Sequence, residues 1–193
     1  SWTALEQPLD ALLDQFSVAA ITLTGAGDLT INRPSSDLTL EGAVTKDGSV
    51  YVTAQKLTVT GAVTAGGINS SRTETVSLVA TGADLILNAP VTAPAAVSLS
   101  ADAGAIVGSA AGLVTTKALD ILALNGATVS TKVETVAGKV TGTGAGITVN
   151  EADDLTVGTA TTPLAANNGP ISVTAAGAMA VNVVNAGTSG SVT

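Results

Sequence analysis

Apolar and polar residues alternate in short segments along most of the chain. Four segments with this alternation each lead into a Gly-Ala pair: residues 21–24, 38–41, 57–60 and 122–125. A second set of apolar-polar-apolar triplets lies at 29–31, 50–52, 76–78, 97–99, 119–121 and 147–149. Successive side chains of a strand point to opposite faces, so this pattern predicts short strands with one buried face. The chain is therefore expected to be all-β.

The Gly-Ala pairs mark a repeat of about 20 residues, a length within the range of known solenoid repeats. They begin at Gly25, Gly42, Gly61, Gly82, Gly104, Gly126, Gly144 and Gly177. Several predicted strands are followed by an asparagine, a residue that tolerates the left-handed conformation of a sharp corner: Asn32, Asn88, Asn125 and Asn150. Short strands and regular corners predict the coils of a β-solenoid, here a parallel β-helix. Residues 17–193 would form about eight or nine coils in a rod about 40 Å long.

A pair of β-sandwich domains is the alternative fold with a similar number of strands. Sandwich cores are about 10 Å thick and commonly use large rings to fill the space between the sheets. Only 2% of this chain is aromatic, with one Trp, one Tyr and one Phe. In a solenoid the side chains stack about 4.8 Å apart from coil to coil, and aliphatic residues fit that spacing well. The composition favours the solenoid.

Residues 1–16 have a different period. Apolar residues recur at helical spacing, and Thr3 with Glu6 fits a capping box. We therefore predict two regions, a short amphipathic cap helix over 1–16 and a solenoid over 17–193. The helix would cover the open edge of the first coil or, alternatively, dock on a neighbouring domain or subunit. Its candidate interface residues are Trp2, Leu5, Leu9, Leu12 and Phe16.

The other end has strand-like sequence and no matching cap. No charged residue follows Asp154, and Val192 lies in the final strand-like segment. Exposed strand edges invite further pairing, so Val192 is a further candidate interface residue. Either the chain was cut from a longer solenoid or another molecule covers this end. The expected partners are neighbouring solenoid segments or identical subunits stacked end to end.

Charge and composition exclude several classes of protein. The 7 basic and 15 acidic residues give a net charge of −8, which opposes binding to nucleic acid phosphates. The chain has no Cys and no His, so it lacks disulfides, thiolate zinc ligands, a cysteine nucleophile and the commonest general base. Mean hydropathy is +0.49. No window of about 20 apolar residues is present, so the chain is not expected to span a membrane.

Few residues offer chemistry. The acidic cluster Glu151, Asp153 and Asp154 is a weak candidate for calcium, because hard cations take carboxylate oxygens. It lacks the spacing of known calcium loops, so a solvated corner is the preferred interpretation and no metal site is assigned. Asp28, Asp37 and Asp84 each precede an apolar triplet and are expected to bond to nearby backbone amides.

Catalytic and cofactor sites are not predicted. Tyr51 is the only ring within the repeats, which leaves no stack of aromatics for a sugar-cleaving cleft, and no nucleotide-binding or nucleophile motif occurs. Thr-x-Thr segments at 22–24, 58–60 and 73–75 are similar to those of ice-binding solenoids. Variable coil lengths and the β-propensity of threonine explain them without such a role. The chain is expected to be a non-enzyme.

Three segments resemble the repeats of filamentous-haemagglutinin-type exoproteins: residues 27–32, 37–44 and 56–63. The resemblance is one of pattern and extends over about residues 17–193. It implies a right-handed parallel β-helix in a bacterial protein that is exported to the cell surface or released. Such proteins serve as adhesins, stalks or filaments, with host or cell-surface glycans or proteins as partners. The family brings no catalytic residues. This chain departs from it in its short length and its acidic first segment.

Overall fold

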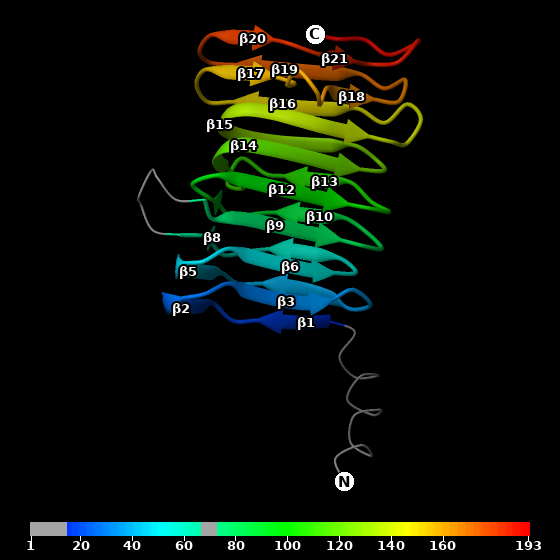
Figure 1. Cartoon of the computed structure of the whole chain (residues 1–193). Helices are drawn as coiled ribbons and strands as arrows, with labels where there is room; N and C mark the ends of the chain where they lie inside the picture. Colours follow the sequence, from blue (N-terminus) through cyan, green and yellow to red (C-terminus); the bar gives the residue numbers. More distant parts are fainter. Residues whose placement is uncertain (1–14, 67–72) are drawn as a thin grey trace.

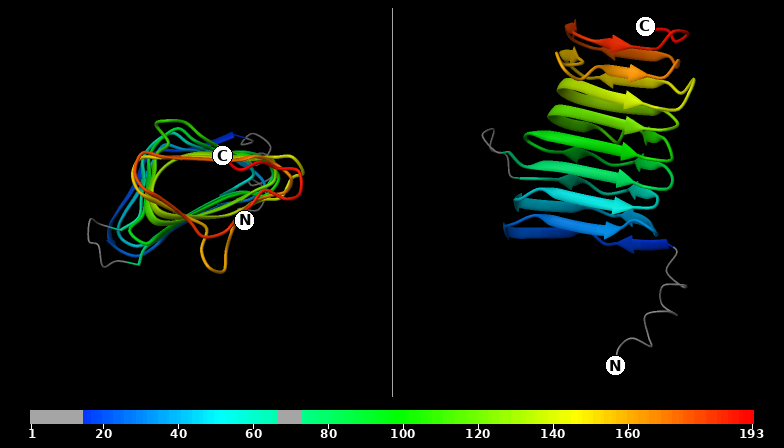
Figure 2. Two further views of the ribbon diagram at one scale, coloured as in Figure 1. Left: turned by 90° about the horizontal axis from the view of Figure 1, so that it is seen from above. Right: turned by 45° about the vertical axis from the view of Figure 1, so that its right-hand side comes forward.

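The chain folds as a parallel β-solenoid, as its sequence predicts. The structure, a computed structural model, describes residues 15–66 and 73–193 (Figure 1). Within these ranges all regular structure is β-strand, and 21 strands join into one continuous parallel sheet. Seen along the axis, the coils lie on top of one another with closely similar outlines (Figure 2).

The strand pairings form three stacks, which we call the first, second and third faces. The first face contains β1 (Gln15–Val18), β4 (Asp37–Leu40), β7 (Leu57–Val59), β10 (Leu85–Leu87), β13 (Ile106–Gly108), the start of β15 (Ala127–Val140), β16 (Ile147–Glu151) and β19 (Ile171–Ala175). The second face contains β2 (Ile21–Ala26), β5 (Ala43–Asp47), β8 (Val63–Thr64), β11 (Val91–Thr92), the start of β14 (Val114–Ala123) and the middle of β15.

The third face contains β3 (Leu29–Arg33), β6 (Val50–Ala54), β9 (Thr75–Ala80), β12 (Ala96–Ala101), the ends of β14 and β15, β17 (Leu155–Val157), β18 (Leu164–Ala166), β20 (Met179–Val181) and β21 (Val184–Asn185). Beyond β15 the second-face column continues in the last residues of β16 and β19, because Glu151 pairs with Thr131 and Ala175 pairs with Glu151. In the last coils one strand therefore serves both the first and the second face. In the axial view the earlier coils extend further on one side than the later ones (Figure 2).

The number of coils follows from the strand register on the first face. One column of paired residues runs through Phe16, Leu38, Leu57, Leu85, Ile106, Ala127, Ile147, Ile171 and Val192. These nine positions define eight turns. The shortest turn runs from Leu38 to Leu57, and the longest runs from Leu57 to Leu85. The predicted repeat length and the predicted number of coils are both confirmed.

Aliphatic columns fill the interior. On the third face one column contains Leu29, Val50, Val76, Val97, Leu119, Val136, Val157 and Val181. From Val50 to Val157 every member is buried. The buried core of the described chain contains no aromatic ring, and Tyr51 points outward, 40% exposed. Residues with branched aliphatic side chains stack well at the spacing between parallel strands, which is the physical basis of the prediction from composition.

The predicted boundary of the cap helix is wrong. Gln15 and Phe16 belong to β1, which pairs in parallel with β4, so the solenoid includes residues assigned to the helix. The rest of the predicted helix, with Trp2, Leu5, Leu9 and Leu12, lies outside the described residues. Phe16 therefore occupies a strand position in the first coil, and tertiary pairing overrides the helical period of the local sequence.

Gly-Ala pairs do not mark equivalent corners. Gly42 and Gly61 precede second-face strands, whereas Gly82, Gly104 and Gly126 precede first-face strands. The asparagine prediction is also wrong for Asn32, Asn88, Asn125 and Asn150. Among the described non-glycine residues the positive φ belongs to Asn168, at 60°. Asn32 and Asn150 instead lie within β3 and β16, because these strands continue beyond the apolar triplet.

Candidate functional site

Aspartates at several corners accept hydrogen bonds from backbone amides of the next coil. The carboxylate of Asp28 accepts a hydrogen bond from the Ser49 amide at 2.8 Å, and that of Asp84 accepts one from the Ala105 amide at 2.8 Å. Both partners lie 21 residues further along the chain. The prediction that these aspartates bond to backbone amides is confirmed, but the amides belong to the adjacent coil. Asp37 is the first residue of β4 and pairs with Gln15.

Hydroxyl and amide side chains make the same kind of bond in the opposite direction. Their donors reach back to carbonyl oxygens of the preceding coil: Thr60 to Leu40, Thr81 to Ala54, Ser109 to Leu87, Thr141 to Ala123, Asn125 to Ala103, Asn167 to Thr141 and Asn182 to Gly158. A side chain engaged in this way holds two coils together and is unavailable for chemistry.

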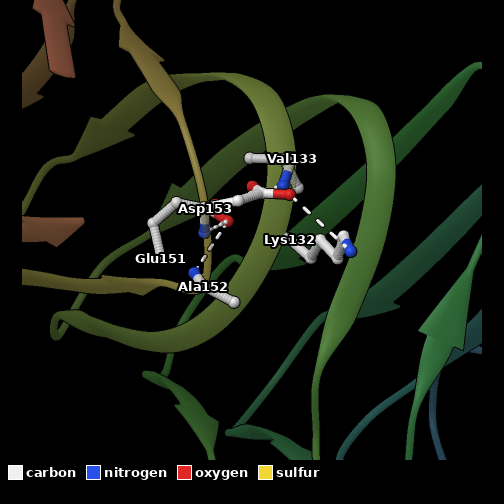
Figure 3. Close-up of polar contacts among 5 residues, drawn as sticks. All are labelled: Lys132, Val133, Glu151, Ala152 and Asp153. Atoms are coloured by element: carbon white, nitrogen blue, oxygen red, sulfur yellow. Dashed lines mark hydrogen bonds and ion pairs between the residues drawn. The ribbon is translucent and has the colours of Figure 1, made fainter. Parts of the chain in front are cut away.

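The acidic cluster begins at the last residue of β16 in the seventh coil, where Glu151 pairs with Thr131 on the second face. Figure 3 shows Glu151 and Asp153 of this cluster. Glu151 is only 5% exposed, and its carboxylate accepts hydrogen bonds from three backbone amides. The Val133 amide donates from the coil before at 3.1 Å, and those of Ala152 and Asp153 donate from the same corner at 2.8 and 3.2 Å. A buried carboxylate is stable in a protein only when such donors satisfy it. Glu151 therefore stabilises this corner from inside the solenoid through three hydrogen bonds to backbone amides.

The other two carboxylates of the cluster have separate partners. Asp154 accepts a hydrogen bond from the Ala178 amide in the next coil at 2.7 Å. Asp153 forms an ion pair with Lys132 at 3.7 Å, in which both side chains are about half exposed (Figure 3). No group of three or more acidic side chains in the described ranges is arranged to hold a metal ion. The linear sequence shows these three carboxylates together, but it carries no sign that Glu151 is buried.

A groove of about 870 Å³ runs along the corner between the second and third faces. Six successive coils line it, with residues 64–66, 92–94, 115–117, 132–134, 152–154 and 176–177. The groove is roughly 24 Å long, since adjacent parallel strands are about 4.8 Å apart. Sequence analysis did not find it, because the coil-to-coil register that brings these segments together is not a local pattern.

The groove offers few groups for chemistry. Its charged lining residues are Lys117, Lys132, Glu134, Asp153 and Asp154. No aromatic ring lies among its described lining residues, so it has no platform on which a sugar could stack. The Thr116 hydroxyl is buried without a hydrogen-bond partner among the described atoms, and its residue is 7% exposed.

The outward threonines do not form a regular array. One outward column of the first face contains Thr39, Thr58, Ile86, Val107, Thr128, Thr148 and Ser172. Ile86 and Val107 interrupt it at mid-length. The Thr-x-Thr segments therefore do not combine into matched rows along this face.

Among the described carboxyl groups, Asp120 has a shifted pKa. Asp120 lies outward on the third face, in a column between Ser98 and Ala137. Although the Asp120 side chain is exposed, partial desolvation by its neighbours raises its pKa above the ordinary value, and attraction to the Lys139 ammonium offsets part of that rise. Both effects arise from the packing of neighbouring coils, which the linear sequence does not specify. Asp120 lies outside the groove.

Apolar side chains are exposed at the last coil. Val192, a candidate interface residue from the sequence, is 56% exposed and forms an isolated bridge to Ile171. Met179 and Val181 are 43% and 59% exposed although they occupy inward positions of β20. Among the described residues, the groove is the candidate site for a partner.

Within residues 15–66 and 73–193, no helix has the length and apolar character needed to cross a bilayer. Comparison of the chain with protein-family models, with curated proteins and with solved structures found no match.

Proposed function

We propose that the chain is a non-enzymatic structural segment of a bacterial surface or secreted exoprotein, in which it acts as a rigid stalk or filament. The observation that carries this proposal is the continuous third-face column from Leu29 to Val181, which crosses every coil. Such a core makes each coil depend on its neighbours and gives the chain a length set by the number of coils.

The use of polar side chains supports the same role. Those of Asp28, Asp84 and Asp154 bond to the backbone of the next coil, and Glu151 braces a corner. The corner carboxylates thus contribute to axial cohesion. Extra bonds parallel to the axis resist bending and fraying, as a stalk under mechanical force requires.

The resemblance to filamentous-haemagglutinin-type repeats supports export to the bacterial surface and an adhesive or spacing role. We also take the coil to be right-handed, because connections between parallel strands are right-handed in about 98% of cases. Host or cell-surface glycans or proteins would then be partners of the assembled protein.

Removal of one complete coil tests the rod. Ile106 and Ala127 occupy the same position in successive coils, so deletion of residues 106–126 joins equivalent points of the winding. We expect this variant to remain folded and to be about 4.8 Å shorter along its axis. Insertion of a second copy of residues 106–126 should lengthen the rod by the same amount. Small-angle scattering measures the length and circular dichroism measures the β content.

A half-coil deletion provides the matched control. Removal of residues 106–116 takes out fewer residues but leaves the first and second faces with a gap that exposes the core. We expect it to destabilise the protein far more than removal of the complete coil. If the complete-coil deletion also unfolds the chain, the protein is one indivisible unit and the rod proposal is wrong.

A further inference from the structure

Asparagine is followed by glycine at two places in the chain, Asn125-Gly126 and Asn168-Gly169. In such a pair the backbone nitrogen of the glycine can attack the side-chain carbonyl carbon, Cγ, of the asparagine, because glycine has no side chain that obstructs the approach. Both pairs lie at corners of the solenoid, Asn125 between β14 and β15 and Asn168 between β18 and β19. The structure holds the two asparagines in different ways.

The side chain of Asn125 is exposed and loosely held. Its φ is not positive, and Nδ2 donates a hydrogen bond to the Ala103 carbonyl oxygen at 3.2 Å. No donor among the described residues bonds to its Oδ1. Within the described chain, neither the Asn125 carbonyl oxygen nor the Gly126 amide has a hydrogen-bond partner. Because glycine tolerates a wide range of φ, the peptide group between these two residues can rotate while both flanking strands stay in place.

Asn168 is fixed by contacts with the next coil. Its Oδ1 accepts hydrogen bonds from the Thr188 amide at 2.8 Å and from the Thr188 hydroxyl at 3.2 Å. Its φ of 60° lies in the left-handed region, where ψ is about +30 to +60° and directs the Gly169 nitrogen away from the Asn168 side chain. Gly169 is buried, and the following Pro170 restricts its backbone. Ring closure at this corner therefore requires both hydrogen bonds to break and the corner to change conformation.

We propose that Asn125 is a site of spontaneous modification, at which the chain deamidates through a succinimide, and that Asn168 is protected from the same reaction. The Gly126 nitrogen loses its proton to solvent and forms a bond to Cγ of Asn125. The bond from Cγ to Nδ2 breaks, and the side-chain nitrogen takes up a proton and leaves as ammonia. Water then opens the ring at either of its two carbonyl carbons. The products are aspartate and isoaspartate, so the net reaction consumes one water and releases one ammonia.

Either product changes the corner between the fifth and sixth coils. Aspartate adds a negative charge to a chain of net charge −8 and removes the Nδ2 donor that bonds to Ala103. Isoaspartate also adds a methylene group to the main chain, between strands whose register pairs Ile106 with Ala127. We expect isoaspartate to weaken the ladder at this corner and aspartate to have a smaller effect. The reaction would therefore alter the solenoid first at this corner.

Peptide mass spectrometry of the full chain, incubated at mildly alkaline pH, tests the proposal. Cleavage after Lys117 and Lys132 releases residues 118–132, in which Asn125 is the only asparagine, and fragmentation of residues 140–193 locates any conversion of Asn168. Asn125 should convert at least about tenfold faster than Asn168, since two hydrogen bonds must break before Asn168 can react. Enzymatic methylation specific for isoaspartate should label residues 118–132. In concentrated urea the two rates should converge, because the unfolded chain holds neither asparagine in place.

Two variants separate the reactive corner from the protected one. Thr188→Val removes one of the two donors to Asn168, so it should raise the rate at Asn168 and leave the rate at Asn125 unchanged. Asn125→Gln keeps a carboxamide but closes a larger ring more slowly, so it should abolish the early conversion of residues 118–132. Circular dichroism should show that both variants are folded.

Three results would overturn the proposal. The first is equal conversion of Asn125 and Asn168 in the folded chain. The second is a folded chain that does not convert over a period in which the unfolded chain reacts fully. The third is a rate at Asn168 that Thr188→Val does not change, because the contrast between the two corners would then have another cause.

Discussion

Glu151 is the residue for which the interpretation from the sequence and the role in the structure differ most. In the sequence it belongs to a cluster of acids that suggests a solvated corner or a weak calcium site. In the fold its carboxylate is buried and receives three backbone amides from two coils. Asp153, two residues further, stays about half exposed and pairs with Lys132. Neighbouring carboxylates thus have different roles because only one of them points into the stack.

Glu151→Gln should destabilise the protein by about 1–3 kcal/mol, because a neutral amide replaces a charged acceptor and one of its two terminal atoms becomes a donor. Equilibrium unfolding in urea measures the change, and amide exchange at Val133, Ala152 and Asp153 should become faster. Asp153→Asn is the control and should change stability by less than about 0.5 kcal/mol, since it removes only an exposed ion pair. Equal effects of the two substitutions would contradict the bracing role of Glu151.

The shifted pKa of Asp120 makes the free energy of unfolding depend on pH. Because its pKa is raised in the folded state, the folded protein binds this proton more tightly than the unfolded chain does. The resulting stabilisation is complete below the ordinary Asp pKa of 3.8 and is lost as the pH rises through the folded-state pKa. Asp120→Asn should therefore raise the urea midpoint at pH 7 relative to the wild type, and this gain should disappear at pH values below 3.8.

The control for Asp120 is Glu134→Gln, which removes one negative charge from another exposed position. If it produced the same gain at pH 7, reduced net charge would explain the result and desolvation of Asp120 would not.

At the scale of elements, β15 shows how one strand serves all three faces. It has 14 residues and pairs with β13, β14, β16, β17 and β18. Gly138 occupies an inward position of this strand with φ of 119°, between Ile121 and Leu164 in register. A Cβ atom at Gly138 would clash with the Ile121 carbonyl oxygen. The strand can bend here only because the residue lacks a side chain.

Gly138→Ala should destabilise the protein by roughly 2–4 kcal/mol, through backbone strain and the clash with Ile121. Gly25→Ala is the matched control, because a Cβ atom there would meet nothing within 4 Å and its φ is not positive. Thermal or urea unfolding compares the two. Similar stabilities of both variants would mean that the bend at Gly138 is not required.

Strands were predictable from the sequence, whereas corners were only partly so. The triplets at 29–31, 50–52, 76–78 and 97–99 all lie in strands, because their alternation directly reflects one buried face. The Gly-Ala pairs fall at different corners, and the left-handed asparagine is Asn168. Corner geometry depends on the coil beneath each turn, and local sequence does not identify that coil.

At the scale of the whole molecule, the register of the coils decides where groups meet. Turns of unequal length still place Leu38, Leu57 and Leu85 in one column, because corners absorb the differences. The same register places the six segments that line the groove along one corner of the solenoid. This candidate site is therefore a consequence of register.

The class of fold, the aliphatic core and the approximate number of coils follow from the amino-acid sequence alone. They depend on period-two alternation, the scarcity of rings and the repeat length, which are all local or compositional properties. The place of Phe16 in β1, the burial of Glu151 and the exposure of Val181 became known only from the folded chain. Each of these depends on the residues one full coil away. Because the corners vary in length, the linear sequence does not show which residues those are.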